Sequence, residues 1–86
     1  MDQLKAFKET VVIARKAPWH TTKNGCSVHH LEGMLKRIQE DQSKKQPEYS
    51  SAKIGRWLGW AQAICCMYSP LGLTLDDFKE LNRKCK

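Results

Sequence analysis

Apolar residues recur at intervals of three and four in four separate segments of this chain, and no long stretch alternates apolar with polar residues. In residues 3–16, for example, the repeat consists of Leu4, Phe7, Val11 and Ala14. Similar spacing appears in residues 28–43, 51–68 and 75–84. A chain of 86 residues has room for one domain. The sequence therefore predicts an all-α fold: one compact four-helix domain over residues 1–86.

Residues that favour helix N-termini precede three of these segments. Ser27 precedes the second segment, Ser50 or Ser51 the third, and Thr74 the fourth. Asp77 follows Thr74 by three residues, which predicts a capping box. In the second helix, residues opposite the apolar stripe are expected to face water; they are Lys36, Arg37, Glu40 and Asp41.

The third segment is apolar on nearly all sides. One face holds Ile54, Trp57, Leu58, Ala61, Ile64, Cys65 and Tyr68, and a second holds Trp60, Ala63 and Met67. A helix of this kind is either central in its domain or covered by another chain. We therefore expect residues 51–68 to form a central helix, buried by the other three helices or by a second copy.

A ladder of small residues runs along this third helix at Gly55, Gly59 and Ala63. Glycine inside a helix costs about 1 kcal/mol relative to alanine, so two of them suggest close approach by another backbone or ring. Packing within the chain is one interpretation of this ladder. A homodimer interface along it is the other.

The four cysteines are predicted to be reduced thiols. Cys65 and Cys66 are adjacent on one helix, which suits a disulfide framework poorly, and residues 1–16 contain no apolar signal-peptide core. The uncharged run from Trp57 to Leu75 is broken by Pro70 and is too short to cross a bilayer. These features predict a cytoplasmic protein with no membrane association.

Few residues suggest metal or catalytic chemistry. Cys26 and His29 have a spacing found in zinc sites, and His20 lies nearby, but no second close pair completes a ligand set. No glycine-rich phosphate loop is present, and Asp76 and Asp77 are explained by helix capping. The sequence therefore predicts no catalytic residue, metal or cofactor, with a structural zinc as a lesser alternative.

The charge balance favours a binding role. The chain carries 15 Lys and Arg against 9 Asp and Glu, a net charge of +6. Trp19 lies in a loop and is the predicted aromatic anchor, unless its ring folds back over the core. Basic residues and a histidine are expected to accompany it on one surface: Arg15, Lys16, His20, Lys23, Lys53 and Arg56. Such a surface would attract an acidic protein or nucleic-acid phosphates.

Two segments carry a resemblance to a known group. Residues 53–63, with the run RWLGWAQA, and residues 73–83, with TLDDFKELNR, resemble small accessory proteins of tailed bacteriophages. The resemblance covers roughly residues 27–84. It implies that the protein acts during bacteriophage infection, and it implies no mechanism. Phage proteins of this size often bind a host protein and redirect or inhibit it.

Together these observations predict a non-enzymatic accessory protein. It would bind a host macromolecule in the host cytoplasm and inhibit or redirect it. The alternative is a nucleic-acid-binding accessory or regulatory protein that uses the same basic surface.

Overall fold

The computed structural model describes residues 1–19 and 26–86, which form four α-helices and no strand. They are α1 (Gln3–Ala14), α2 (Val28–Gln42), α3 (Ser51–Tyr68) and α4 (Leu75–Lys84). The predicted all-α class is confirmed. The first helix ends at Ala14 and not at residue 16, because Lys16 N donates to Ile13 O, three residues back, and the chain leaves the helix there.

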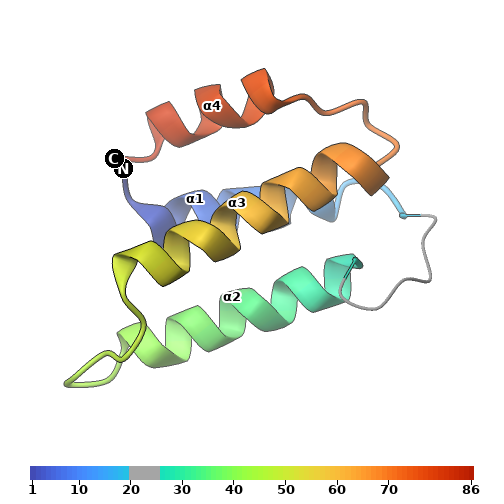
Figure 1. Cartoon of the computed structure of the whole chain (residues 1–86). Coiled ribbons are helices and arrows are strands. Elements are labelled where there is room, and N and C mark those ends of the chain that lie inside the picture. The colour runs from blue at the N-terminus through green and yellow to red at the C-terminus, as the bar shows by residue number, and fades with distance from the viewer. Residues whose placement is uncertain (20–25) are drawn as a thin grey trace.

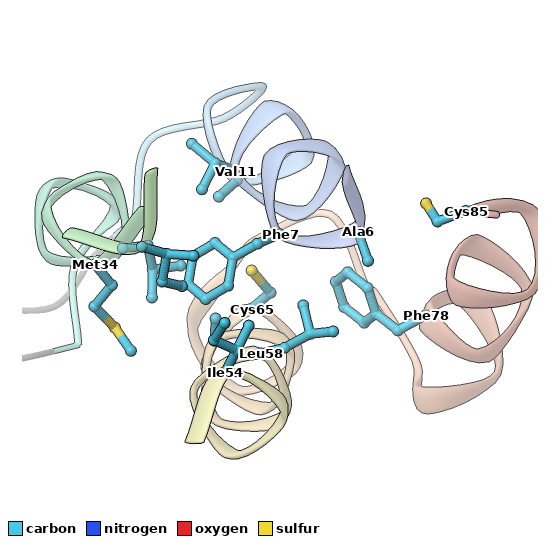
Figure 2. Close-up of a cluster of buried hydrophobic side chains, with 13 residues drawn as sticks. Ala6, Phe7, Val11, Met34, Ile54, Leu58, Cys65, Phe78 and Cys85 are labelled. Atoms are coloured by element: carbon cyan, nitrogen blue, oxygen red, sulfur yellow. The ribbon is translucent and has the colours of Figure 1, made fainter. Parts of the chain in front are cut away.

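Contacts between the helices define their directions. An added Cβ on Gly55 would lie 2.9 Å from Gln3 Nε2, and Gln62 Nε2 lies 3.3 Å from Thr10 Oγ1, so α1 and α3 run parallel. Helices α2 and α4 lie on either side of this pair and run antiparallel to it (Figures 1 and 2). The two chain ends meet, where Asp2 N donates to Cys85 O at 2.8 Å.

The core lies where α1 faces the other three helices. Figure 2 shows Phe7 of α1 pointing between α2 and α3, and Phe78 of α4 pointing toward Ala6. One side of α1 is fully enclosed: Ala6, Phe7, Thr10, Val11 and Ala14 are all buried.

The expectation that the third helix is buried nearly all round is not confirmed. Ile54, Leu58 and Cys65 of α3 are buried as predicted. On the second apolar face, however, Trp60 is 39% exposed and Met67 is 68% exposed. The other helices pack on the side of α3 that faces α1, so its far side stays open.

The predicted N-terminal caps form. Ser27 Oγ accepts from His30 N, and Ser50, not Ser51, accepts from Lys53 N. Thr74 and Asp77 make the reciprocal capping box, with Thr74 N donating to Asp77 Oδ2 at 2.8 Å. Asp2 caps α1 by accepting from Lys5 N, a cap absent from the sequence-based prediction.

Asp41 does not face water, contrary to the sequence-based expectation. It is 2% exposed, and its carboxylate accepts hydrogen bonds from Glu48 N, Tyr49 N and Gln42 Nε2 at 2.9, 3.0 and 2.9 Å. The connector between α2 and α3 folds back over the end of α2 to supply the two backbone donors. The spacing of apolar residues along the helices gives no sign that the connector folds back in this way.

A polar cluster made of the buried Thr10 and Gln62 and the half-buried Asn82 joins three helices. The side-chain amides of Gln62 on α3 and Asn82 on α4 pair reciprocally at 2.8 and 3.2 Å. Gln62 Nε2 also reaches Thr10 Oγ1, which donates to Ala6 O at 2.8 Å. These bonds satisfy polar groups inside the bundle and set the position of α4 along α3.

We expect Gln62→Ala to lower the free energy of unfolding by about 1–3 kcal/mol, because it leaves the Asn82 amide without its partner. Urea unfolding followed by circular dichroism measures this loss. Gln62→Ala combined with Asn82→Ala should cost less than the sum of the two single changes. Additive costs would show that the amide pair does not couple α3 to α4.

Candidate binding surface

The side of α3 turned away from α1 is an exposed stripe, which we call the α3 outer face. Steps of three and four residues place its members along one side of the helix, and all of them are exposed: Ala52, Arg56, Gly59, Trp60, Ala63 and Met67. The stripe is about 22 Å long at 1.5 Å per residue. Figure 2 shows Ile54, Leu58 and Cys65 on the opposite side of α3, within the core.

The chemistry of the α3 outer face is mostly apolar. Arg56 is its single charged residue, while Trp60 and Met67 project large apolar side chains. Helix α2 covers part of this face at Trp60, whose ring meets His30. Exposed apolar residues gathered in this way, with few charges between them, are typical of protein interfaces.

Helix α2 fixes the position of the Trp60 ring. His30 meets Trp60 edge to face, with ring centroids 5.4 Å apart and planes at 70°. Beside this pair, a pocket of about 190 Å³ lies over the surface of α2 and is lined by His29, His30, Gly33, Met34 and Arg37. The α3 outer face therefore has a border that carries Arg37 and two histidines.

A second aromatic group lies at the beginning of α3. Tyr49 and Trp57 have ring centroids 5.5 Å apart, and Lys53 Nζ lies 3.9 Å from the Tyr49 centroid and 5.3 Å from that of Trp57. The Lys53 ammonium is therefore held by cation–π contacts within the chain. Trp57 is half-buried, so Trp60 is the tryptophan most available to a partner.

Among the described residues, the structure does not bring the predicted basic side chains onto one surface. Arg15 forms an ion pair with Glu32 at 2.6 Å, at the C-terminal end of α1 next to Lys16. Lys53 and Arg56 lie near the beginning of the parallel helix α3, about 18 Å away along the helix axis. The predicted contact residues His20 and Lys23 lie outside the described residues.

Trp19, the predicted anchor, is half-buried and packs against the core cluster. Its Nε1 is buried and has no hydrogen-bond partner among residues 1–19 and 26–86. This placement matches the alternative interpretation, in which the ring folds back over the core.

The ladder of small residues divides between two environments. Gly55 faces α1, where an added Cβ would lie 2.9 Å from Nε2 of the flexible Gln3 side chain. An added Cβ on Gly59 would meet nothing within 4 Å, and Ala63 is exposed. Gly55 therefore lies against α1, whereas Gly59 and Ala63 are open on the α3 outer face.

All four cysteines are free thiols in the structure. Burial and the adjacent Cys66 raise the pKa of Cys65 to about 12, and burial and Asp77 raise the pKa of Cys66. Both thiols are therefore protonated at neutral pH and are weak nucleophiles or metal ligands. Among the described residues, no three His, Cys, Asp or Glu side chains gather as a metal site, although His20 lies outside this set.

Sequence reasoning placed Trp60 and Met67 on a second apolar face and favoured Trp19 over Trp60 as the aromatic anchor. The sequence did contain a sign of this exposed face. A helix with two apolar faces in a domain of only four helices is expected to leave one face uncovered. Comparison with known proteins finds no matching family model, curated relative or solved structure. In the described part of the chain, no helix has the length and hydropathy needed to cross a membrane.

Proposed function

We propose that this chain is a non-enzymatic protein-binding module that places the α3 outer face on another protein. The supporting observation is the exposed, nearly uncharged stripe centred on Trp60. Aromatic residues at the centre of an interface contribute much of the binding free energy, and small neighbours such as Gly59 and Ala63 allow close contact.

The charge distribution favours a protein partner over nucleic acid. A surface that binds nucleic acid needs several lysines and arginines that face successive phosphates. On the α3 outer face only Arg56 is charged, and Arg15 is already paired with Glu32 at the other end of the bundle. Binding through phosphates therefore remains the second candidate, with Arg37 and the neighbouring histidines as its contacts.

The resemblance to bacteriophage accessory proteins supports a more specific version of the proposal. In that setting the partner is a host protein in the host cytoplasm, and binding inhibits or redirects it. The four-helix domain would then act by covering a functional surface of the partner.

A capture experiment with tagged protein and a host lysate tests this function. Trp60→Ala should weaken capture of a defined partner about 30-fold or more, as expected for a central aromatic residue. Met67→Glu should also reduce capture, and because Met67 is 68% exposed its replacement leaves the fold intact. Val12→Glu is the matched control, since Val12 is an exposed apolar residue on α1.

Trp19→Ala tests whether Trp19 or Trp60 makes the contact. Because Trp19 packs on the core and lies off the α3 outer face, Trp19→Ala should leave capture of the partner largely unchanged in folded protein. Undiminished capture by both Trp60→Ala and Met67→Glu would refute the proposed surface. Binding of DNA or RNA that falls steeply with salt, without a captured protein, would favour the second candidate.

A further inference from the structure

We propose that the pocket on α2 binds a single phosphate group. This α2 pocket has a volume of about 190 Å³ and is lined by His29, His30, Gly33, Met34 and Arg37. Three of these five residues are basic, and none of the described lining residues is acidic. The inference goes beyond the proposed function, because it does not require the α3 outer face to bind a protein.

Arg37 reaches the α2 pocket without a counterion. Side chains on a helix lean toward its N-terminus, so the Arg37 side chain lies over the preceding turn. The residues three and four positions earlier are Met34 and Gly33, and neither can pair with a cation. Arg15 and Arg83 form ion pairs with glutamates, whereas no ion pair holds Arg37 within residues 1–19 and 26–86.

The acidic residues of α2 are engaged elsewhere or lie beyond Arg37. Glu32 pairs with Arg15, and Asp41 accepts hydrogen bonds from the connector. Glu40 follows Arg37 by three residues, so it lies on the opposite side from the turn over which Arg37 leans. The positive charge of Arg37 is therefore available to a ligand in the α2 pocket.

Gly33 leaves the space that a ligand would fill. An added Cβ on Gly33 would meet nothing within 4 Å among the described residues, so no packing contact there requires a glycine. Glycine is also less favourable than alanine inside a helix. Its missing side chain opens the helix surface between His29 and Arg37, each four residues away on the same side of α2.

The Trp60 ring holds the His30 ring at the edge of the α2 pocket. The two ring centroids are 5.4 Å apart and the ring planes meet at 70°. A side chain that is already oriented loses less conformational freedom when a ligand binds. A histidine ring can donate a hydrogen bond from a ring nitrogen, so His30 offers a positioned donor beside the charge of Arg37.

Size and charge favour phosphate as the ligand. The α2 pocket is smaller than the roughly 300–1,000 Å³ of sites for drug-sized molecules. The fork of a guanidinium matches two phosphate oxygens, and a phosphate monoester carries a charge of about −1.5 to −2 at pH 7. Because His29, His30 and Arg37 are exposed, solvent and salt screen the attraction. We therefore expect a Kd on the order of 1 mM at low salt.

Titration of the isotope-labelled full chain with sodium phosphate, followed by NMR, tests the inference. The amide signals of His29, His30, Gly33 and Arg37 should shift together and saturate with one dissociation constant. Sodium chloride at matched ionic strength measures the effect of screening alone. Sodium acetate, whose anion carries less charge, should bind about 10-fold more weakly or less.

A second titration with phenyl phosphate distinguishes two sources of the phosphate group. Tighter binding than that of inorganic phosphate supports a phosphate monoester as the ligand, with its organic part beside the Trp60 ring. Weaker binding supports free phosphate.

Three variants locate the site. Arg37→Gln should weaken phosphate binding by about 10-fold or more, because it removes the charged donors. Lys36→Gln is the matched control, since Lys36 is the adjacent exposed cation and does not line the α2 pocket, and it should leave binding nearly unchanged. Gly33→Leu should abolish binding by filling the pocket, while leucine favours the helix. Circular dichroism confirms that each variant is folded.

Equal shifts with chloride and phosphate at matched ionic strength would overturn the proposal, as would equal affinity for acetate and phosphate. Undiminished phosphate binding by folded Arg37→Gln or Gly33→Leu would also overturn it. Met67 does not line the α2 pocket, so Met67→Glu should retain phosphate binding while it reduces capture of a protein partner. Failure of the phosphate site and failure of the proposed function are therefore distinguishable.

Discussion

Phe7→Ala is expected to lower the free energy of unfolding by about 3–5 kcal/mol, the usual cost of removing a buried phenylalanine side chain. Phe7 is fully buried and points from α1 between α2 and α3, so its loss opens a cavity where three helices meet (Figure 2). Domains of this length have a total stability of about 4–13 kcal/mol. The variant should therefore unfold at a clearly lower urea concentration and a lower temperature than the wild type, as measured by urea or thermal unfolding.

Met67→Ala is the control for Phe7→Ala, because Met67 is 68% exposed and its truncation should change stability by about 0.5 kcal/mol or less. Phe7→Leu should retain most of the stability by keeping the site filled. A loss below about 1 kcal/mol for Phe7→Ala would show that α1 is not the centre of the core.

Asp41→Asn is expected to destabilise the protein at neutral pH and to reduce its sensitivity to acid. Burial raises the pKa of Asp41, but hydrogen bonds from Tyr49 N, Glu48 N and Gln42, together with Lys44, outweigh it, so the pKa is lowered from 3.8. An asparagine can accept at one oxygen only, and its amide group would face one of the two backbone donors.

The direction of the pH dependence follows from the lowered pKa. The unfolded state binds the proton more readily than the folded state, so Asp41 stabilises the fold at pH values above its unfolded pKa of about 3.9. This contribution is lost as the pH falls through the folded pKa. Urea unfolding at pH 7 and at pH 3 should therefore show a larger difference between wild type and Asp41→Asn at pH 7.

Glu40→Gln is the control for Asp41→Asn, since Glu40 is the adjacent carboxylate and is exposed. Its replacement should change stability little at either pH. An Asp41→Asn variant with wild-type stability at pH 7 would show that the Asp41 carboxylate does not secure the connector between α2 and α3.

The helices were predictable because their determinants are local. Ser27 and the Thr74–Asp77 capping box act within one turn, and the apolar repeat of Phe7, Val11 and Ala14 reports a single helix face. The buried face of α3, with Leu58 and Cys65, was predictable for the same reason. Val12 and Leu75 are apolar but exposed, because each lies at the edge of the buried side of its helix.

The candidate surface was less predictable, because exposure depends on where the neighbouring helices lie. Arg15 and Arg56 carry the same charge but have different surroundings. Arg15 is paired with Glu32, whereas Arg56 lies on the mostly apolar outer face of α3. Trp19 and Trp60 are both tryptophans, but one folds back on the core and the other faces outward. The sequence spacing contains no information about which helix covers which.

The amino-acid sequence by itself determined the four helices and the N-terminal caps of α2, α3 and α4, since these depend on residues within one or two turns. Only the tertiary structure decided that α1 is central and that α3 is covered on one side. It also decided that Asp41 is buried beneath a returning connector and that the basic residues lie at separate ends. These features arise from contacts between residues far apart in the chain, which periodicity does not encode.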